Sequence, residues 1–204
     1  MKPDPAEFWN TRYAAPGFAY GEAPNDFLVE VADRIPAGPV LCLAEGEGRN
    51  AVFLAKRGHA VTAVDLSSVG LGKAKASAER AGVALTTVVA NLASWPMPER
   101  AFAGVISIWA HLPTPERAAL HARVARALVP GGVFVLEAYR PGQEQRGTGG
   151  PPNVELLMRA QELREELTGL EVVIAREVTR AIHEGQYHQG DSDVVQVLAR
   201  RAAP

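Results

Sequence analysis

The sequence predicts a three-layer α/β domain, in which helices cover both faces of a mostly parallel, seven-stranded sheet whose last strand is antiparallel. Three observations lead to this prediction. Short apolar segments alternate with segments of helical periodicity from residue 40 to residue 138, and such alternation produces right-handed crossovers and a parallel sheet. The last two apolar segments, 171–179 and 194–199, have little helical pattern between them, so they should pair as an antiparallel hairpin. The length, 204 residues, suits one such domain.

Two helices are expected before the first strand. One follows Asp4 as N-cap with Pro5 in its first turn and runs to about Tyr13, and the other contains the apolar positions of 27–35 and ends at Pro36. Residues 1–37 should therefore form a helical cap segment on a Rossmann-like core of residues 38–204, within a single domain. The core strands are expected at 40–43, 60–64, 84–90, 105–108 and 133–138, with helices up to 57 and over 69–81, 114–128 and 154–167.

Composition limits the classes of function. Lysine plus arginine (21) nearly balance aspartate plus glutamate (23), whereas a nucleic-acid-binding protein usually has a basic excess. No apolar segment is long enough to span a bilayer, Met1–Pro5 lack the apolar run of a signal peptide, and a single cysteine, Cys42, suits a reducing compartment. We therefore expect a cytoplasmic protein with neither nucleic acid nor membrane as partner. The oligomeric state is not determined by the sequence.

The segment VLCLAEGEGRNAVFLA, residues 40–55, reads as a strand, a turn with Gly46 and Gly48, and the start of a helix. Glycines let a backbone approach a ligand closely, and a helix start offers free N–H groups. Asp65 ends the next strand, 19 residues after Gly46, where a carboxylate can accept hydrogen bonds from two ribose hydroxyls. These features fit NAD and S-adenosylmethionine equally, so the turn alone does not decide between the two cofactors.

Seven segments resemble, in their order, the class I S-adenosylmethionine-dependent methyltransferases. The segments are FWNTRY, YGEAPNDFL, GEGRNAVFLA, VTAVDLS, LVPGGVFVLEAY, TGGP and EGQYHQG. More narrowly, they resemble the bacterial group related to tellurite-resistance and thiopurine methyltransferases. The resemblance implies S-adenosyl-L-methionine as the cofactor and S-adenosyl-L-homocysteine as the product.

The same resemblance implies a role for individual residues. The backbone of Ala44, Glu45 and Gly46 passes beside the methionine portion of the cofactor, with Gly48 in the same turn. Asp65 holds the ribose and Leu66 lies beside the adenine. The remaining implied contacts are Asn91 at the adenine amino group, the Leu92 amide at its ring nitrogen, Ile108 on the cofactor's other side, and Trp9, Tyr13 and Tyr20, which close over the cofactor or simply pack in the core.

The first strand departs from the family pattern. Most relatives have Asp-Leu-Gly-Cys-Gly where this chain has Cys42-Leu43-Ala44-Glu45-Gly46, and Asn91 replaces the usual aspartate. The lost aspartate usually helps to orient the ammonium group of the cofactor. Our hypothesis is that Glu45 supplies the missing carboxylate. The alternative is that Glu45 points to solvent and backbone carbonyls hold the ammonium.

The acceptor should bind outside the carboxyl ends of the strands. His111 follows the fourth strand and His188 lies in EGQYHQG; either is a candidate general base, because histidine titrates near neutrality, and either could instead satisfy a turn. Gly147–Gly150 is expected to form a mobile lid or an ordinary loop. The spacing of the histidines and aspartates in 183–193 matches no metal motif, so no metal is expected. Other polar side chains expected at this face are Arg140, Gln143, Arg146, His183 and Tyr187.

Taken together, the residues and the resemblance predict a methyltransferase that uses S-adenosylmethionine and acts on a small-molecule acceptor. The resemblance implies a soft sulfur, selenium or tellurium nucleophile as the acceptor atom. Two alternatives stay open. A non-catalytic protein that binds S-adenosylmethionine or S-adenosylhomocysteine would keep the glycines and Asp65. An NAD-dependent oxidoreductase would need the same turn but a sheet that is parallel throughout.

Overall fold

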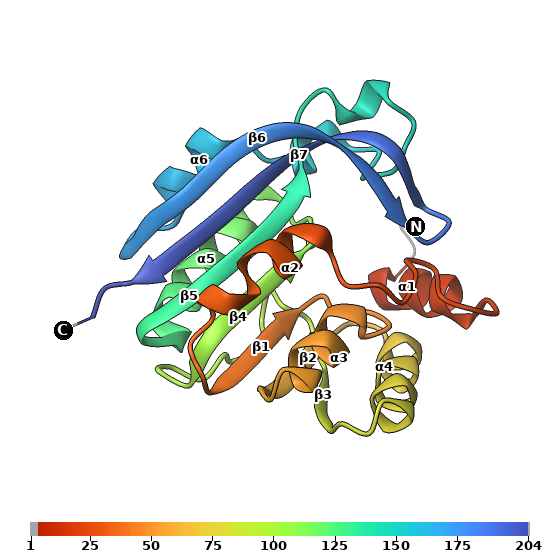
Figure 1. Ribbon diagram of the computed structural model, residues 1–204. Coiled ribbons are helices and arrows are strands. Elements are labelled where there is room, and N and C mark those ends of the chain that lie inside the picture. Colours follow the sequence, from red (N-terminus) through yellow and green to blue (C-terminus); the bar gives the residue numbers. More distant parts are fainter. Residues whose placement is uncertain (1–3, 204) are drawn as a thin grey trace.

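A computed structural model describes residues 4–203. Seven strands form one sheet in the order β3-β2-β1-β4-β5-β7-β6 (Figure 1). Strand β7 is antiparallel to both β5 and β6, and the other neighbouring strands are parallel. The strands are β1 (Pro39–Leu43), β2 (Ala60–Asp65), β3 (Leu85–Val89), β4 (Phe102–Ile108), β5 (Leu128–Tyr139), β6 (Leu170–Glu184) and β7 (His188–Arg201). The predicted fold class and the terminal hairpin are confirmed.

The helices cover both faces of this sheet and are mostly short. They are α1 (Pro5–Ala14), α2 (Asp26–Val31), α3 (Arg49–Lys56), α4 (Ser68–Arg80), α5 (Thr114–Ala127) and α6 (Ala160–Glu166), with 3-10 turns at Ala32–Arg34, Gln143–Gln145 and Val154–Leu156. As expected, the Asp4 side chain caps α1 by accepting from the Ala6 amide. The Ser67 side chain caps α4 in the same way, through the Gly70 amide.

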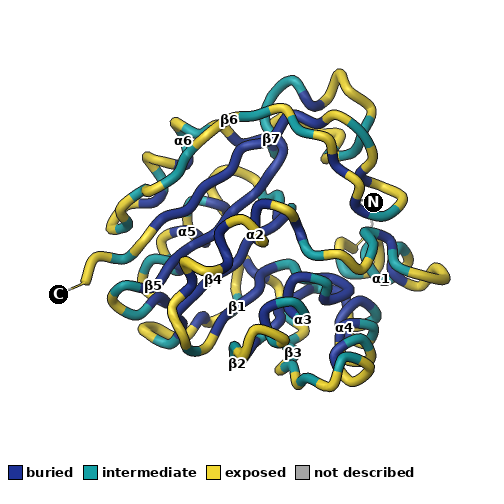
Figure 2. Tube along the Cα trace, in the orientation of Figure 1, coloured by how far each residue is buried: buried dark blue, intermediate teal, exposed yellow. Residues whose placement is uncertain are grey.

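Two apolar clusters fill the spaces between the sheet and its helices. One contains Leu120, Val124 and Leu163 of α5 and α6, and the other contains Phe27, Leu28 and Leu54 of α2 and α3. The central strands are buried between these clusters along almost their whole length (Figure 2). Burial on both faces explains why β1 and β4 read as continuous apolar runs rather than as alternating patterns.

The cap segment is fastened to the core by polar contacts. Asn10 of α1 accepts hydrogen bonds from the Ser67 hydroxyl (2.7 Å) and the Val69 amide (3.3 Å) at the start of α4. Lys73 donates to the carbonyl oxygens of Ala15 and Gly17, which lie in the loop after α1. These contacts place α1 over the carboxyl edge of β1 and β2. The division at residue 37 stays a prediction, and residues 1–3 and 204 of the proposed domain range lie outside the described residues.

Strands β4 and β5 begin earlier than predicted, at Phe102 and Leu128, and two predicted segments differ in the type of structure that they form. The expected helix over 154–167 is wrong in its first part, because Val154–Leu156 form a 3-10 turn and α6 begins only at Ala160. The expected loop between the last two strands is also wrong, because β6 and β7 run on until only residues 185–187 separate them. Residues at the tip of the hairpin pair with one another, from Thr179↔Asp193 to Glu184↔His188. Because many of them are polar, the sequence has no apolar pattern there that would predict strands.

Candidate active site

The glycine turn lies between the end of β1 and the start of α3. Gly46 and Gly48 both have positive φ, 59° and 89°, and a Cβ on Gly48 would lie 2.5 Å from the Cβ of Ala74. Asp65, at the end of β2, accepts hydrogen bonds from the Gly46 amide (2.8 Å) and the Ser67 amide (2.7 Å). Burial raises the pKa of this carboxyl above its usual value, although these two amides act in the opposite direction. The turn and Asp65 therefore form one unit.

The two unusual residues of the turn have distinct surroundings. Ala44 adopts φ 49°, the left-handed conformation that glycine tolerates and alanine does not favour. The Glu45 carboxylate accepts a 2.7 Å hydrogen bond from the Ala51 amide in the first turn of α3. Burial raises the pKa of Glu45 to about 7, against the opposing effects of that amide and of Arg49. Glu45 thus points toward the helix start rather than freely into solvent.

The three aromatic side chains expected to close over the cofactor do gather near the turn. A Cβ on Gly46 would lie 2.5 Å from the Tyr13 hydroxyl oxygen, so this ring lies directly against the turn. Trp9 stacks on Tyr13 with ring centroids 5.7 Å apart, and Tyr20 meets Tyr13 edge-on at 6.2 Å. Arg12 completes the group by donating to the Tyr20 hydroxyl (3.0 Å) and packing 4.2 Å from the Tyr187 ring centre.

The residues assigned to the adenine side follow the ends of three strands, β3, β2 and β4, with β1 lying between the last two. Leu66 follows β2 and is half-buried, Leu92 is buried after β3, and Ile108 is buried at the end of β4. Asn91 is exposed, and its side-chain oxygen accepts from the Ala93 amide, which fixes the turn after β3. The structure therefore gives Asn91 a local structural contact in the place where a contact to adenine was expected.

His111 is fully engaged within the chain. Its Nδ1 lies 3.0 Å from the Trp109 carbonyl oxygen, to which it must donate, and its Nε2 accepts from the Tyr139 amide at 3.1 Å. Burial lowers the pKa of this imidazole to about 4. A neutral ring with both nitrogens occupied fastens the loop after β4 to β5, and it has no free lone pair for a substrate proton.

His188 has different surroundings. It is the first residue of β7 and is buried, yet its Nδ1 has no hydrogen-bond partner among residues 4–203. The imidazole lies within 4.7–5.3 Å, between ring centres, of Tyr20, Trp109 and Tyr139. Burial lowers the pKa of His188, while the neighbouring Glu184 carboxylate raises it. Of the two candidate histidines, only His188 has a ring nitrogen without a hydrogen-bond partner among residues 4–203.

Several side chains around His188 were not assigned from the sequence. Trp109 follows β4 with φ 61°, Tyr139 ends β5, and Glu184 ends β6. Trp109 donates from its indole nitrogen to Glu184 at 2.7 Å and stacks on Tyr139 at 4.4 Å between ring centres. Trp109 and Tyr139 could have been found from the sequence, because each lies at the carboxyl end of a predicted strand. Glu184 could have been found as the acid that begins the segment EGQYHQG.

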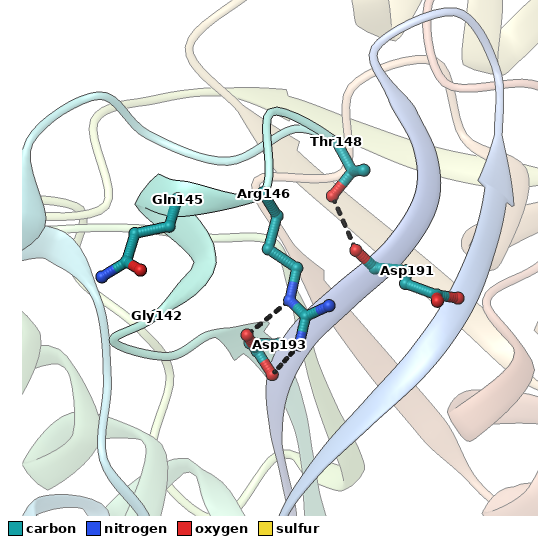
Figure 3. Close-up of a pocket in the computed structure, with 6 residues that line it drawn as sticks. All are labelled: Gly142, Gln145, Arg146, Thr148, Asp191 and Asp193. Atoms are coloured by element: carbon teal, nitrogen blue, oxygen red, sulfur yellow. Dashed lines mark hydrogen bonds and ion pairs between the residues drawn. The ribbon is translucent and has the colours of Figure 1, made fainter.

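The polar residues of the loop 140–150 mostly bind one another and β7. Gln143 is buried and accepts from the Asp193 amide while donating to the Gly149 carbonyl. Arg140 and Arg146 both pair with Asp193 at 2.6 Å. Figure 3 shows a cavity of about 440 Å³ beside Arg146 and Asp193. The cavity is lined by Gly142, Gln145, Arg146, Thr148, Asp191 and Asp193. It contains neither Asp65 nor His188, so it is separate from the candidate site.

Comparison with known proteins identifies the domain. Residues 40–132 match a family described as a methyltransferase domain. The chain carries an S-adenosylmethionine-dependent methyltransferase domain. A search of curated proteins found no match, so the remaining comparisons are with solved structures, all below 25% identity.

Those structures share the fold of this methyltransferase. A protein from work on the conversion of a disulfide bond into a thioacetal group during echinomycin biosynthesis has a TM-score of 0.78 and 20% identity, with 97% of this chain and 92% of that chain covered. TehB from Haemophilus influenzae has a TM-score of 0.73 and 17% identity, covering 96% of this chain and 66% of its own. A methyltransferase from Methanosarcina mazei has a TM-score of 0.70 and 16% identity, covering 86% and 98%.

The cofactor of the methyltransferase domain is S-adenosylmethionine. One structure of the same fold, magnesium protoporphyrin IX methyltransferase from Synechocystis (TM-score 0.63, 19% identity, 86% of this chain and 80% of that chain covered), holds bound S-adenosylhomocysteine. The NAD alternative required a sheet that is parallel throughout, and the antiparallel β7 contradicts it. Within residues 4–203, no cluster of histidine, cysteine, aspartate and glutamate is arranged to hold a metal ion. Among the helices of the same residues, none combines the length and apolar character needed to cross a membrane.

Proposed function

We propose that this methyltransferase transfers the methyl group of S-adenosylmethionine to a small-molecule acceptor with a soft sulfur, selenium or tellurium nucleophile, and that it works in the cytoplasm. One observation carries the proposal. A continuous row of rings runs from the glycine turn to His188, through Tyr13 and Tyr20. This row lies at the carboxyl edge of the sheet, where α/β folds bind ligands. It joins the place for the cofactor to a place for an acceptor.

The residues of the turn suit the cofactor. The Asp65 carboxylate accepts from the Gly46 and Ser67 amides, and we assign its remaining acceptor capacity to the ribose hydroxyls. Gly46 and Gly48 keep the turn free of side chains beside Tyr13 and Ala74. Leu66, Leu92 and Ile108 would supply apolar contacts around the adenine, with Asn91 at its edge. Trp9, Tyr13 and Tyr20 would exclude water from the sulfonium, as methyl transfer requires.

Glu45 is assigned to the methionine ammonium as part of this proposal. When bound, the cofactor brings that cation to the Ala44–Gly46 turn, and a carboxylate with a pKa near 7 would gain its full charge beside it. Replacing Glu45 with Gln preserves the acceptor for the Ala51 amide and removes the charge. We expect an affinity for S-adenosylmethionine about tenfold weaker by titration calorimetry. An unchanged affinity would show that backbone carbonyls hold the ammonium.

Calorimetry on protein stripped of co-purified ligand tests the proposed function. Titration with S-adenosylmethionine, S-adenosylhomocysteine and NADH should show binding of the first two alone. Acceptors are then screened with radiolabelled S-adenosylmethionine, beginning with thiols, selenols and tellurite. Binding without turnover on any small acceptor would reject the proposed acceptor class, and absence of binding would show that the altered turn has lost the cofactor.

A further inference from the structure

Two buried polar atoms at the acceptor side have no partner among residues 4–203. They are Nδ1 of His188 and the hydroxyl oxygen of Tyr139. His188 is 6% exposed and Tyr139 is 0% exposed, and their ring centres are 5.3 Å apart. A buried polar group without a partner destabilises the folded chain. The Tyr139 hydroxyl is therefore open to a ligand, whereas the Nδ1 of His188 faces the Glu184 carboxylate at a distance beyond hydrogen-bond length.

Glu184 lies directly behind His188. The two residues face each other across the β6–β7 ladder, and the Glu184 Oε2 atom is 3.8 Å from Nδ1 of His188. That distance is beyond hydrogen-bond length, but such catalytic contacts are often long in the free protein and shorten when substrate binds. The same oxygen accepts from the indole nitrogen of Trp109 at 2.7 Å and pairs with Arg49 at 2.5 Å, so the carboxylate is fixed in place.

The protonation states of His188 and Glu184 suit a general base and a carboxylate that orients it. Burial by itself would raise the pKa of Glu184, but His188, Arg49 and Trp109 together hold it well below its usual range, so the group is a carboxylate. Burial lowers the pKa of His188, which is therefore neutral near pH 7. The charged and titratable groups packed around His188 are Arg12 of α1, Tyr20, Arg49 of α3, His111, Tyr139 of β5, Glu184 of β6 and Tyr187.

We propose that Glu184 is a positioning residue that orients His188 as the general base, and that the site takes an uncharged acceptor whose thiol or selenol must lose a proton. This inference rests on the proposed function and narrows its acceptor to protic nucleophiles. In the reaction, His188 Nε2 takes the proton of the acceptor, and an acceptor lone pair forms the new bond to the methyl carbon. The carbon–sulfur bond of the cofactor breaks with its electron pair left on sulfur, and the imidazolium returns its proton to solvent.

The surrounding charges favour a neutral acceptor over an oxyanion such as tellurite. Of the two cations near His188, Arg49 pairs with Glu184, and Arg12 donates to the neutral Tyr20 hydroxyl and packs on the Tyr187 ring. Aromatic rings form the other neighbours of His188, and Gly149 lies against it, since a Cβ there would be 2.9 Å from the imidazole. An oxyanion would lose its hydration among these rings and beside the Glu184 carboxylate.

Two aromatic thiols of similar size separate a base from a structural residue. 4-Nitrothiophenol is already an anion at neutral pH, whereas benzyl mercaptan keeps its proton and needs a base. Glu184→Gln should lower kcat/KM for benzyl mercaptan at least tenfold and for 4-nitrothiophenol less than threefold, with the acidic limb of the pH profile moved to lower pH. Glu184→Asp, which keeps the charge against Arg49 but withdraws it from His188, is the second variant and should give the same pattern.

Glu166→Gln is the matched control, because Glu166 also pairs with an arginine and a histidine, Arg117 at 2.6 Å and His121 at 2.8 Å, and shares no partner with Glu184. It should leave the ratio between the two thiols unchanged. An NMR titration of the His188 ring should show a lower pKa in Glu184→Gln, independent of any acceptor.

Equal losses of kcat/KM on both thiols, or an unchanged pKa of His188, would overturn the positioning role of Glu184. Faster turnover of tellurite than of either thiol, or no thiol turnover, would overturn the acceptor class. Calorimetry with S-adenosylmethionine shows separately whether the proposed function itself has failed.

Discussion

The cofactor side and the acceptor side of this methyltransferase are built in opposite ways. The centre of the proposed cofactor side is nearly contiguous in sequence: β1, the glycine turn and Asp65 lie within residues 39–65, and backbone amides make the main contacts of its two carboxylates. The acceptor side joins Tyr20, Trp109, Tyr139, Glu184 and His188, which come from distant segments and meet through side chains. A motif can describe the first kind of site, whereas only folding assembles the second.

The buried carboxylates of the two sides differ accordingly. Glu45 faces amide dipoles and has Asp65 nearby, so burial prevails and raises its pKa to about 7. Glu184 faces guanidinium and indole donors, and these hold its pKa far below the usual range in spite of burial. The cofactor side can therefore accept a cation, whereas at the acceptor side the Glu184 carboxylate already pairs with Arg49.

The largest effect should come from the carboxylate that organises the cofactor side. We expect Asp65→Ala to weaken binding of S-adenosylmethionine at least about 100-fold, because two charge-assisted hydrogen bonds to the ribose would be lost at about 1.5–3 kcal/mol each. Calorimetry measures this change. Asp65→Asn retains an acceptor for one amide and should fall between Ala and the original chain, and an affinity within threefold of the original for Asp65→Ala would refute the assignment.

A pH dependence of stability should come from Glu45. Its folded pKa of about 7 lies above the ordinary value of 4.5, so the folded chain binds more protons between these values. The free energy of unfolding should therefore fall as pH rises from about 4.5 to about 7, by up to about 3 kcal/mol from this group. Urea unfolding of the original chain and of Glu45→Gln at pH 5 and pH 8 checks this, since the variant should lose that part of the decrease. Identical pH slopes would contradict it.

On the acceptor side, Gly149→Ala should lower kcat/KM about tenfold while leaving the affinity for S-adenosylmethionine unchanged. Gly149 has φ 131°, and an added Cβ would lie 2.6 Å from the Tyr187 carbonyl oxygen and 2.9 Å from the His188 ring, so the loop must shift at a cost of about 1–3 kcal/mol. Gly147→Ala is the control, because Gly147 also has positive φ but open space around it. Equal losses in both variants would place the effect in backbone strain instead of contact with His188.

The smallest effect concerns Ala44. Because its φ is 49°, Ala44→Gly should relieve left-handed strain and stabilise the chain by about 0.5–1 kcal/mol, after the greater entropy of glycine in the unfolded state is subtracted. Urea unfolding measures the change. The control is Ala55→Gly inside α3, which should destabilise by about 1 kcal/mol. A destabilised Ala44→Gly would mean that the methyl group contributes packing that exceeds the strain.

The sequence by itself determined the sheet, the hairpin, the helix starts at Pro5 and Ser68, and the glycine turn with its acid. These follow from local causes: apolar periodicity, side-chain caps and glycines at positive φ. The sequence did not predict the strands formed by polar residues at the tip of β6 and β7. Such strands are stabilised by pairing with a neighbouring strand, and a local sequence pattern does not show which strand that will be.

Tertiary structure alone decided the difference between the two histidines. In the sequence His111 and His188 are equivalent candidates, each beside a strand end. In the fold, His111 has both nitrogens occupied by backbone groups of Trp109 and Tyr139, whereas His188 has a buried nitrogen facing Glu184. The hydrogen bonds available to an imidazole depend on groups brought from other strands, and their positions exist only once the sheet has formed.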